Sequence, residues 1–568
     1  MQDGDRTGRG HAVVAGAGIG GLLAARVLSE SFARVTVVDR DALPEGGGPR
    51  RGVPQSHHAH GMLSKGFEVL QDLFPGLRED LVARGALVRD VQADVNWFND
   101  GRRLLRAPSG LPCLMVSRPE LERHLRSRVA ALPGVEIQQR TEVLEPVADP
   151  AGGRVTGVRL LRVNAEPEVL AADLVVDATG RSNRGATWLR TLGYAPAPEE
   201  RVDSGLVYVS REYRRSPGDA DADAFVVGAS ADAPRGGVAL SGEGDRWLVT
   251  LFGMNGDVPP VDPEGYHRFA QRLPVPDLHR LLERLEPLTD PRLMRSPVSI
   301  RRRYERLERF PEGYLVLADA LCQFNPTYGQ GMTVAACEAA ALRECLAEAS
   351  GEPLARRFFR RAAVITDVAW DMSVGGDLRF PFVDGRRSPR VRLLNRYVAR
   401  IHRAAEADAG VGRAFLAVAN LAEPPQRLLA PRCWPGWSGP RGRHRPPGCA
   451  ASRRPSRDPR RSARNARPPD RVPGADGGGS GRRRVRPAEG PAGGGSGQRC
   501  GSRSLFTTMT LPLPRTPPVP RAPGCSTRSP RSVTRRWRCS PTATAAHRYP
   551  APSGRWPRPR PTWRWRTS

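Results

Sequence analysis

Short apolar runs, followed by glycines and then by apolar residues at helical spacing, are the clearest pattern in the first 430 residues. Four consecutive apolar residues at 12–15 predict a buried strand, and the apolar positions between 22 and 28 recur with helical spacing. A second buried strand is predicted over 35–38, and Asp39 follows it directly. The change of period predicts a strand–helix–strand unit, from which parallel sheets are built.

The turn between the first strand and the helix fits the pattern G-x-G-x-x-G with Gly16, Gly18 and Gly21. The first glycine makes the tight turn, the second lets backbone approach a pyrophosphate, and the third lets the helix pack on the strand. The start of the helix offers free N–H groups to phosphates. An acid at the position of Asp39 accepts hydrogen bonds from ribose hydroxyls. The set predicts a dinucleotide site; the alternative is a glycine-rich packing turn.

Two later stretches repeat the arrangement of a buried strand that ends near an acid. In residues 173–184, "DLVVDATGRSNR", Asp177 ends the predicted strand; in residues 314–333, Asp319 follows the strand closely. The second stretch continues into an alanine-rich helix through Pro326, Gly329 and Gly331. An acid at a strand end, followed by glycines that open a helix, suits a phosphate-bearing ligand with many hydroxyls. The start of the last helix also suits negative charge on a reduced flavin ring.

The three motifs in this order resemble the flavoprotein monooxygenases of the para-hydroxybenzoate hydroxylase fold group. "RRGVPQSHHAHGM" at 50–62 and "DATGR" at 177–181 are similar to a subgroup that contains actinobacterial tailoring oxygenases and the flavin epoxidases of polyether pathways. The resemblance covers residues 10–430 and implies an α/β fold with a Rossmann-like FAD-binding domain of the GR2 type. It further implies an inserted β-sheet substrate domain and C-terminal helices. The expected ranges are 10–190 and 290–350 for the FAD domain, 191–300 for the sheet domain and 351–430 for the helical region.

The resemblance also assigns roles to single residues. It implies that Gly16, Gly18 and Gly21 face the FAD pyrophosphate and that Asp39 faces the adenosine ribose. The other cofactor-binding residues that it implies are Arg118 at the flavin, Val143 at adenine through its backbone, Asp319 at the ribityl–pyrophosphate region, and Pro326, Gly329 and Gly331 along the ring. Two departures from the family pattern are Ala178 and Ala318, each where glycine is usual. Because of Ala178, the resemblance implies less about how NADPH docks. Ala318 predicts a slightly different backbone beside Asp319.

The activity that the resemblance implies is monooxygenation. FAD, reduced by NAD(P)H, would react with O2 to a flavin hydroperoxide and insert one oxygen atom into a small hydrophobic substrate, by hydroxylation or epoxidation, in secondary metabolism. The reductant would use the same domain or a separate flavin reductase. No catalytic side chain and no metal site is expected. His57, His58 and His60 are interpreted as a loop that faces flavin or substrate, because no further ligand cluster lies near them in the sequence.

Two other functions stay open, and a third is disfavoured. A reductase of isoprenoid double bonds shares the "DATG" element, and a basic nucleic-acid-binding protein would fit the net charge of +29. A flavin halogenase is disfavoured because it needs a guiding lysine, and the chain has only Lys65. No stretch is apolar and long enough to predict a membrane span. The first four cysteines lack metal or disulfide spacing, which favours a reducing, cytoplasmic compartment: Cys113, Cys322, Cys337 and Cys345.

The charge is concentrated in the last part of the chain. Of the 88 basic and 59 acidic residues, 31 arginines and only four acids follow residue 430, so the first 430 residues are almost neutral. Residues 431–568 are dominated by Arg, Pro, Gly, Ser and Ala, which predicts a disordered tail. We interpret residues 431–568 as the product of a shifted reading frame in GC-rich DNA. The alternative interpretation of the tail is a nucleic-acid-binding arm. The rest of the chain is almost neutral and is predicted to bind neither nucleic acid nor membrane.

Overall fold

A computed structural model describes residues 9–182 and 184–429 of the chain. The predictions for the basic tail of 431–568, including the shifted frame and the nucleic-acid-binding arm, lie outside the described residues. Within the described ranges, no helix is long and apolar enough to cross a membrane.

A five-stranded parallel sheet forms the first layer, in the order β20 (Tyr314–Val316), β12 (Leu174–Asp177), β1 (Arg9–Ala15), β2 (Phe32–Val38) and β8 (Val135–Gln138). The predicted strand–helix–strand unit is confirmed: β1 pairs in parallel with β2, and α1 (Ile19–Leu28) connects them. Residues 12–14 are fully buried because both faces of the sheet are covered.

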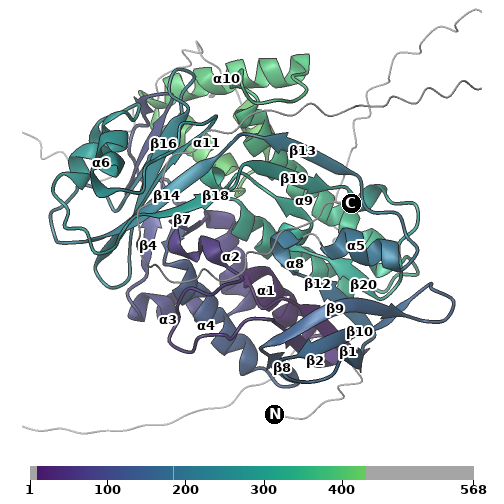
Figure 1. The fold of residues 1–568 in the computed structure, drawn as a ribbon. Coiled ribbons are helices and arrows are strands. Elements are labelled where there is room, and N and C mark those ends of the chain that lie inside the picture. Colours follow the sequence, from purple (N-terminus) through teal and green to yellow (C-terminus); the bar gives the residue numbers. More distant parts are fainter. Residues whose placement is uncertain (1–8, 183, 430–568) are drawn as a thin grey trace, which may run out of the picture. The chain divides into compact units, whose positions relative to one another are not determined.

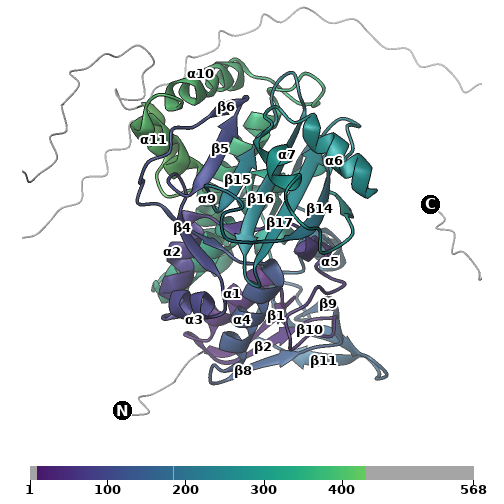
Figure 2. The same cartoon turned by 90° about the vertical axis from the view of Figure 1, so that its left-hand side faces the viewer.

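Helices cover one face of this sheet, and a small antiparallel sheet contacts its strand β12. Helix α1 packs against α4 (Arg118–Ala130) and α8 (Gly331–Ala347). The small sheet consists of β9 (Thr141–Ala148), β10 (Val155–Arg162) and β11 (Glu168–Ala171), and β10 contacts β12. Both sheets lie in the lower part of Figures 1 and 2. Because the strands are parallel, β1, β2, β12 and β20 all end at one edge, which brings the three sequence motifs together.

A seven-stranded sheet lies above these two sheets in both views. Its order is β18 (Arg292–Arg295), β14 (Val207–Arg214), β17 (Arg246–Gly253), β16 (Arg235–Gly242), β15 (Ala224–Val227), β5 (Val95–Asn99) and β6 (Arg102–Arg103). The first five strands fall in the predicted substrate range, but β5 and β6 come from residues that the sequence places in the FAD domain. β5 joins by parallel pairing with β15. The sheet therefore needs an earlier segment of the chain than residues 191–300 alone.

Alternation along these strands gives the seven-stranded sheet two different faces. Phe225, Ala239 and Val249 point to a core that they share with α6 (Pro263–Gln271) and α7 (Asp277–Leu282). Their sequence neighbours on the other face line a large cavity, among them Val226, Val238, Leu240 and Thr250. A period of two places successive side chains on opposite faces, so one face is structural and the other is free for a ligand.

Three C-terminal helices close the fold, as the resemblance implies. Helix α9 (Leu354–Asp377) packs on α8, while α10 (Pro389–Ala405) and α11 (Ala409–Ala419) pack on each other and on the residues around β5 and β15. The remaining elements are α2 (Ser64–Leu73), α3 (Leu77–Ala83), α5 (Arg184–Thr191) and two small sheets: β3 (Gly61–Met62), β7 (Pro112–Met115) and β4 (Leu87–Asp90); and β13 (Glu199–Asp203), β19 (Val298–Arg302) and β21 (Cys322–Gln323).

Candidate functional site

One cavity collects almost all of the residues that the sequence singles out. Nine of the ten candidates line it: Gly16, Gly18, Asp39, Arg118, Val143, Asp319, Pro326, Gly329 and Gly331. The exception is Gly21. The same cavity continues along the free face of the seven-stranded sheet, so the predicted cofactor residues and the predicted substrate surface share one space.

The three glycines of the first turn have different surroundings. Gly16 has a left-handed φ of +106°, and a Cβ there would lie 2.5 Å from the carbonyl oxygen of Ala178. A Cβ at Gly21 would overlap the carbonyl oxygen of Gly16. At Gly18, the nearest atom is the tip of the Arg50 side chain at 3.8 Å, so the space beside it is open. Gly18 thus borders the cavity, whereas Gly21 lies outside the cavity lining and packs against the turn at Gly16.

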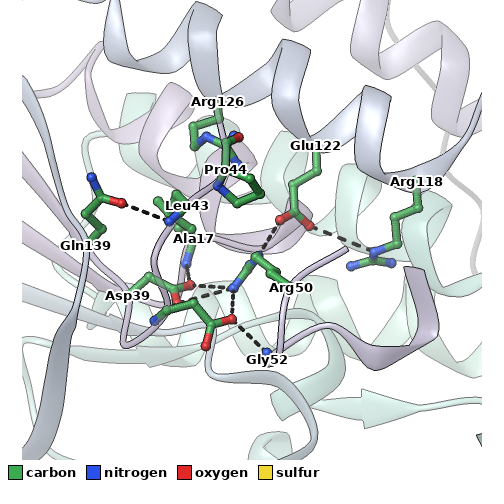
Figure 3. A network of polar contacts seen from close by, with 11 residues as sticks. Ala17, Asp39, Leu43, Pro44, Arg50, Gly52, Arg118, Glu122, Arg126 and Gln139 are labelled. Carbon is green, nitrogen blue, oxygen red and sulfur yellow. Dashed lines mark hydrogen bonds and ion pairs between the residues drawn. The ribbon is translucent and has the colours of Figure 1, made fainter. Parts of the chain in front are cut away.

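A buried ion-pair network surrounds Asp39 at the end of β2 (Figure 3). The Asp39 carboxylate accepts hydrogen bonds from the N–H of Ala17 at 2.7 Å and of Asp41 at 2.9 Å, and from the Arg50 guanidinium at 3.2 Å. Arg50 also donates to Asp41 at 2.8 Å and to Glu122 at 2.7 Å. The same Arg50 nitrogen is also 3.2 Å from the other oxygen of Asp39, so the roughly four lone-pair sites of this carboxylate all have partners within the protein. A ribose hydroxyl would replace one of these two long contacts from Arg50, which holds Asp39 in place.

Removing the Asp39 carboxylate should weaken FAD binding. In Asp39→Ala the ribose loses a charged acceptor, and such hydrogen bonds contribute about 1.5–3 kcal/mol each, or roughly a ten- to hundredfold rise in the FAD Kd. The matched control is Asp41→Ala, which also removes a partner of Arg50 but does not line the cavity. Titrations of the apoprotein with FAD should show the loss only in the first variant. An equal loss in both would mean that Asp39 acts only by holding Arg50.

Arg118 begins α4 beside this network and has an unmet donor. Ser117 caps the helix by accepting from the N–H of Glu120. The Nε of Arg118 is buried without a hydrogen-bond partner, and the nearest carboxylate oxygen, on Glu122, is 3.9 Å away. Burial lowers the pKa of the guanidinium. A largely buried cation on a cavity wall fits an anionic or oxygen-rich ligand such as the FAD phosphates and flavin carbonyls.

In the middle motif, Asp177 is buried behind the cavity wall and does not line the cavity. Asp177 is fully buried and accepts from the N–H of Thr179 at 2.9 Å, from its hydroxyl at 2.6 Å and from the Tyr314 hydroxyl at 3.2 Å. Burial raises the pKa of Asp177. Arg184 donates to the carbonyl of Val143, a residue of β9 that lines the cavity. The surface that faces the cavity here includes Ala178, Thr179, Gly180 and Arg181.

The late motif keeps a glycine-like backbone despite its alanine. Ala318 has a φ of +62°, in the left-handed region that favours glycine, so the slightly different backbone predicted beside Asp319 is not what this φ indicates. The N–H of Ala318 donates to the buried Glu338 of α8 at 2.7 Å. Burial raises the pKa of Glu338 to about 8. Asp319 lies next to this turn, faces the cavity and is 3.5 Å from the guanidinium of Arg181.

The raised pKa of Glu338 predicts a pH-dependent stability. The folded protein keeps the Glu338 proton up to about pH 8, whereas an unfolded glutamate releases it near pH 4.3. The stabilisation that the bound proton gives is complete below that pH and falls as pH rises to about 8, by at most ~1.4 kcal/mol per pH unit. Glu338→Gln has no proton to lose. Its unfolding free energy, measured in urea, should therefore rise relative to that of the parent protein between pH 5.5 and pH 7.5. Parallel curves of unfolding free energy against pH would contradict the assignment.

The turn before α8 borders the cavity with open space. Gly329 has a φ of +68° after the short helix Pro326–Tyr328, and a Cβ at Gly331 would find only a carboxylate oxygen of Asp319, at 3.9 Å. The hydroxyl of Tyr328 donates to the buried Asp377 at the end of α9, at 3.1 Å. The helix start of α8 is thus exposed to whatever ligand fills the cavity.

The histidine-rich segment also lines the cavity. His58 shares a hydrogen bond of 2.7 Å with the Ser210 hydroxyl, and the Nδ1 of His60 is 2.7 Å from the carbonyl oxygen of His58. The pKa of His58 is lowered to about 4 and that of His60 to about 3, mainly because both rings are buried. Both rings are neutral at physiological pH. Among the described residues, no group of His, Cys, Asp and Glu has the arrangement of a metal site.

Comparison with known proteins agrees with this geometry. Residues 10–355 match the family described as FAD binding domain, and the chain belongs to this family: it is an FAD-dependent oxidoreductase of the monooxygenase group that its motifs resemble. Protein Rv3254 of Mycobacterium tuberculosis strain H37Rv is 37% identical over 392 residues, which are 67% of this chain and 82% of that protein.

Solved structures show the same fold at low identity. A flavoprotein/dehydrogenase from Cytophaga hutchinsonii has a TM-score of 0.53 at 15% identity, over 72% of this chain and 92% of its own. The flavin-dependent brominase Bmp2 has a TM-score of 0.51 at 17% identity, over 70% and 93%. The p-nitrophenol 4-monooxygenase PnpA from Pseudomonas putida DLL-E4 has 0.50 at 17%, over 72% and 99%. The similarity concerns the fold.

Proposed function

We propose that the protein uses FAD and NAD(P)H to insert one oxygen atom from O2 into a small hydrophobic substrate, by hydroxylation or epoxidation. The observation that carries this proposal is the shared cavity: the cofactor residues form one wall, and the free face of the seven-stranded sheet forms another. The sheet wall is largely apolar, with Trp97, Val226, Leu240, Phe252 and Met254. Such a wall selects apolar substrates and excludes water from the reacting atoms.

The residues of the chain bind and orient, while the cofactor supplies the chemistry. FAD, when bound, provides the oxygen-activating chemistry. Gly18 and the start of α1 would hold its pyrophosphate, Asp39 its adenosine ribose, and Arg118 the flavin side of the molecule. Gly331 and the start of α8 would direct a positive helix end at the ring. Asp319 and the N–H of Val143 complete the set of residues that we assign to FAD.

The physiological setting follows from the cysteine spacing and from the sequence resemblance, and it is part of the proposal. We assign the protein to the cytoplasm and to secondary metabolism, with either NAD(P)H docking on the same domain or a separate flavin reductase as the source of electrons. A halogenase is disfavoured, because Lys65 is paired with Glu68 at 2.9 Å and is the only lysine.

The test is oxygen-18 incorporation. The FAD-loaded protein, with NAD(P)H or with a flavin reductase, is given 18O2 and a panel of aromatic and polyene compounds. We expect one labelled oxygen atom per product, with oxygen consumed in step with the product. A product that gains two hydrogens and no label would identify the alternative reductase of isoprenoid double bonds instead. A folded protein that stays colourless after addition of FAD would contradict both functions.

A further inference from the structure

Helix α10 exposes arginines that have no acidic partner. The helix contains no acid, and all five of its arginines are exposed: Arg390, Arg392, Arg396, Arg400 and Arg403. None of these five guanidinium groups forms an ion pair or a hydrogen bond with a described residue. The last four, the arginine stripe, follow one another at helical spacing and lie on one face of α10. Like charges at this spacing repel each other, so the stripe does not stabilise the helix.

The first turn of α10 shows the same conflict between its charge and the stability of the helix. Ser388 caps the helix by accepting from the N–H of Val391, and the turn contains no acid. Arg390 and Arg392 lie at this end, where the helix dipole favours negative charge. The opposite face of α10 holds the helix, because Ile401 and its buried neighbours pack with α11. The charge of the outer face is therefore available to an anionic partner.

Large apolar side chains are exposed near the arginine stripe. Leu393 is 68% exposed and Leu394 is 41% exposed. Val364 of α9 is 68% exposed, and Leu429, beyond α11, is 63% exposed. All four line the large cavity, together with three arginines of the stripe. Because exposed residues of α10 form part of its wall, the cavity reaches the surface of the protein at this helix.

Charge and apolar surface together favour one kind of partner. Clustered arginines on a helix attract anionic lipid headgroups, and exposed leucines enter the boundary between headgroups and acyl chains. A nucleic-acid duplex would pair with the arginines through its phosphates but would leave the leucines in water. In Figures 1 and 2, α10 lies along the upper edge of the described residues, at the opposite end from β8.

We propose that α10 docks on an anionic lipid surface, with the arginine stripe on the headgroups and Leu393 among the upper acyl chains. The near-neutral charge of the first 430 residues predicts no membrane binding, but a net charge averages over the whole surface and does not describe one helix. Docking in this way turns the cavity opening toward the bilayer. Apolar substrates would then enter from the lipid; this consequence rests on the proposed function, whereas the docking itself does not.

The test is hydrogen exchange, measured peptide by peptide by mass spectrometry in the full chain loaded with FAD. A local measurement is needed, because residues 431–568 carry 31 arginines and attract anionic vesicles by charge alone. The probes are vesicles of phosphatidylglycerol and phosphatidylcholine in equal parts, vesicles of phosphatidylcholine alone, and a DNA duplex. We expect only the anionic vesicles to slow exchange in peptides from residues 389–405, by at least about threefold, since a bound surface opposes opening of the helix.

Charge reversal shows whether the stripe causes this protection. The stripe variant combines Arg392→Glu, Arg396→Glu and Arg400→Glu, and it should fold because acids suit the start of a helix. Retained FAD and unchanged exchange in α11 without vesicles check the fold. The control variant has the same change of net charge at three other exposed arginines: Arg78→Glu, Arg84→Glu and Arg190→Glu. We expect the protection of α10 to disappear in the stripe variant and to remain in the control variant.

Several results would overturn the proposal. They are unchanged exchange in α10 with anionic vesicles, equal protection by phosphatidylcholine alone or by DNA, protection that persists in the stripe variant, and protection that is lost in the control variant. Because no step uses oxygen transfer, the outcome is separate from that of the oxygen-18 test. A protein that oxygenates a substrate but leaves α10 unprotected loses this inference and keeps the proposed function. A protein that docks through α10 but transfers no oxygen loses the proposed function instead.

Discussion

Gly18→Ala and Gly21→Ala should damage the protein in two different ways. At Gly21 the added Cβ overlaps the backbone oxygen of Gly16, so α1 must move away from β1. Overpacking of this kind costs about 1–3 kcal/mol or more, and we expect a lower unfolding temperature even without FAD. At Gly18 the Cβ has room in the protein and projects where the pyrophosphate should approach. That variant should keep its stability without FAD and bind FAD at least about tenfold more weakly.

Thermal unfolding with and without added FAD measures both effects in one experiment. The parent protein should gain stability as FAD is added, because a ligand that binds only the folded state stabilises it. Gly18→Ala should start at the parent temperature and gain less. Gly21→Ala should start lower. If both variants lost stability alike in the absence of FAD, Gly18 would be a packing residue, and the first motif would not be the pyrophosphate site.

The sequence was sufficient for those parts of the site that depend on local pattern. The parallel strands, the turns at Gly16 and Gly329, and the acids at strand ends are all encoded within stretches of about thirty residues. Parallel pairing then places the ends of β1, β2, β12 and β20 at one edge whatever lies between them. This explains why nine candidates chosen from distant motifs line one cavity.

The parts that the sequence did not predict depend on contacts between distant residues. Arg50 lies inside a quoted motif, but its contacts with Asp39 and with Glu122 of α4 have no local signal. The pairing of β5 with β15 joins residues about 130 positions apart. The contact between His402 and Asp100 joins residues 302 positions apart. Periodicity describes one element at a time, so partners of this kind are visible only in the fold.

The alanine at 318 illustrates a different limit. The departure from the family pattern predicted a slightly different backbone beside Asp319, and Ala318 adopts the left-handed conformation with φ of +62°. The hydrogen bond from its N–H to Glu338 and close packing against the Gly20 position, where a Cβ would lie 2.6 Å from that of Ala318, fix the turn. A left-handed alanine costs of order 1–3 kcal/mol and persists where its surroundings over-determine it.

Replacement of Gly331 should impair the reaction rather than the fold. A Cβ at this position meets no protein atom nearer than 3.9 Å, so the branched side chain of valine would extend into the cavity where the flavin ring should lie. We expect weaker FAD binding. The remaining flavin should be harder to reduce, because the positive end of α8 no longer reaches the ring. The control is Gly351→Val, at a glycine that also has open space but does not line the cavity.

At equal FAD occupancy, the flavin midpoint potential and the product formed per NAD(P)H oxidised should both fall in Gly331→Val, with the difference appearing as hydrogen peroxide. Gly351→Val should match the parent protein in all three quantities. The product is the compound labelled in the oxygen-18 test, and the potential needs no substrate. A Gly331→Val protein with an unchanged potential and an unchanged ratio would place this turn at a ligand other than the flavin ring. A lower unfolding temperature with full coupling would reduce Gly331 to a residue that only starts α8.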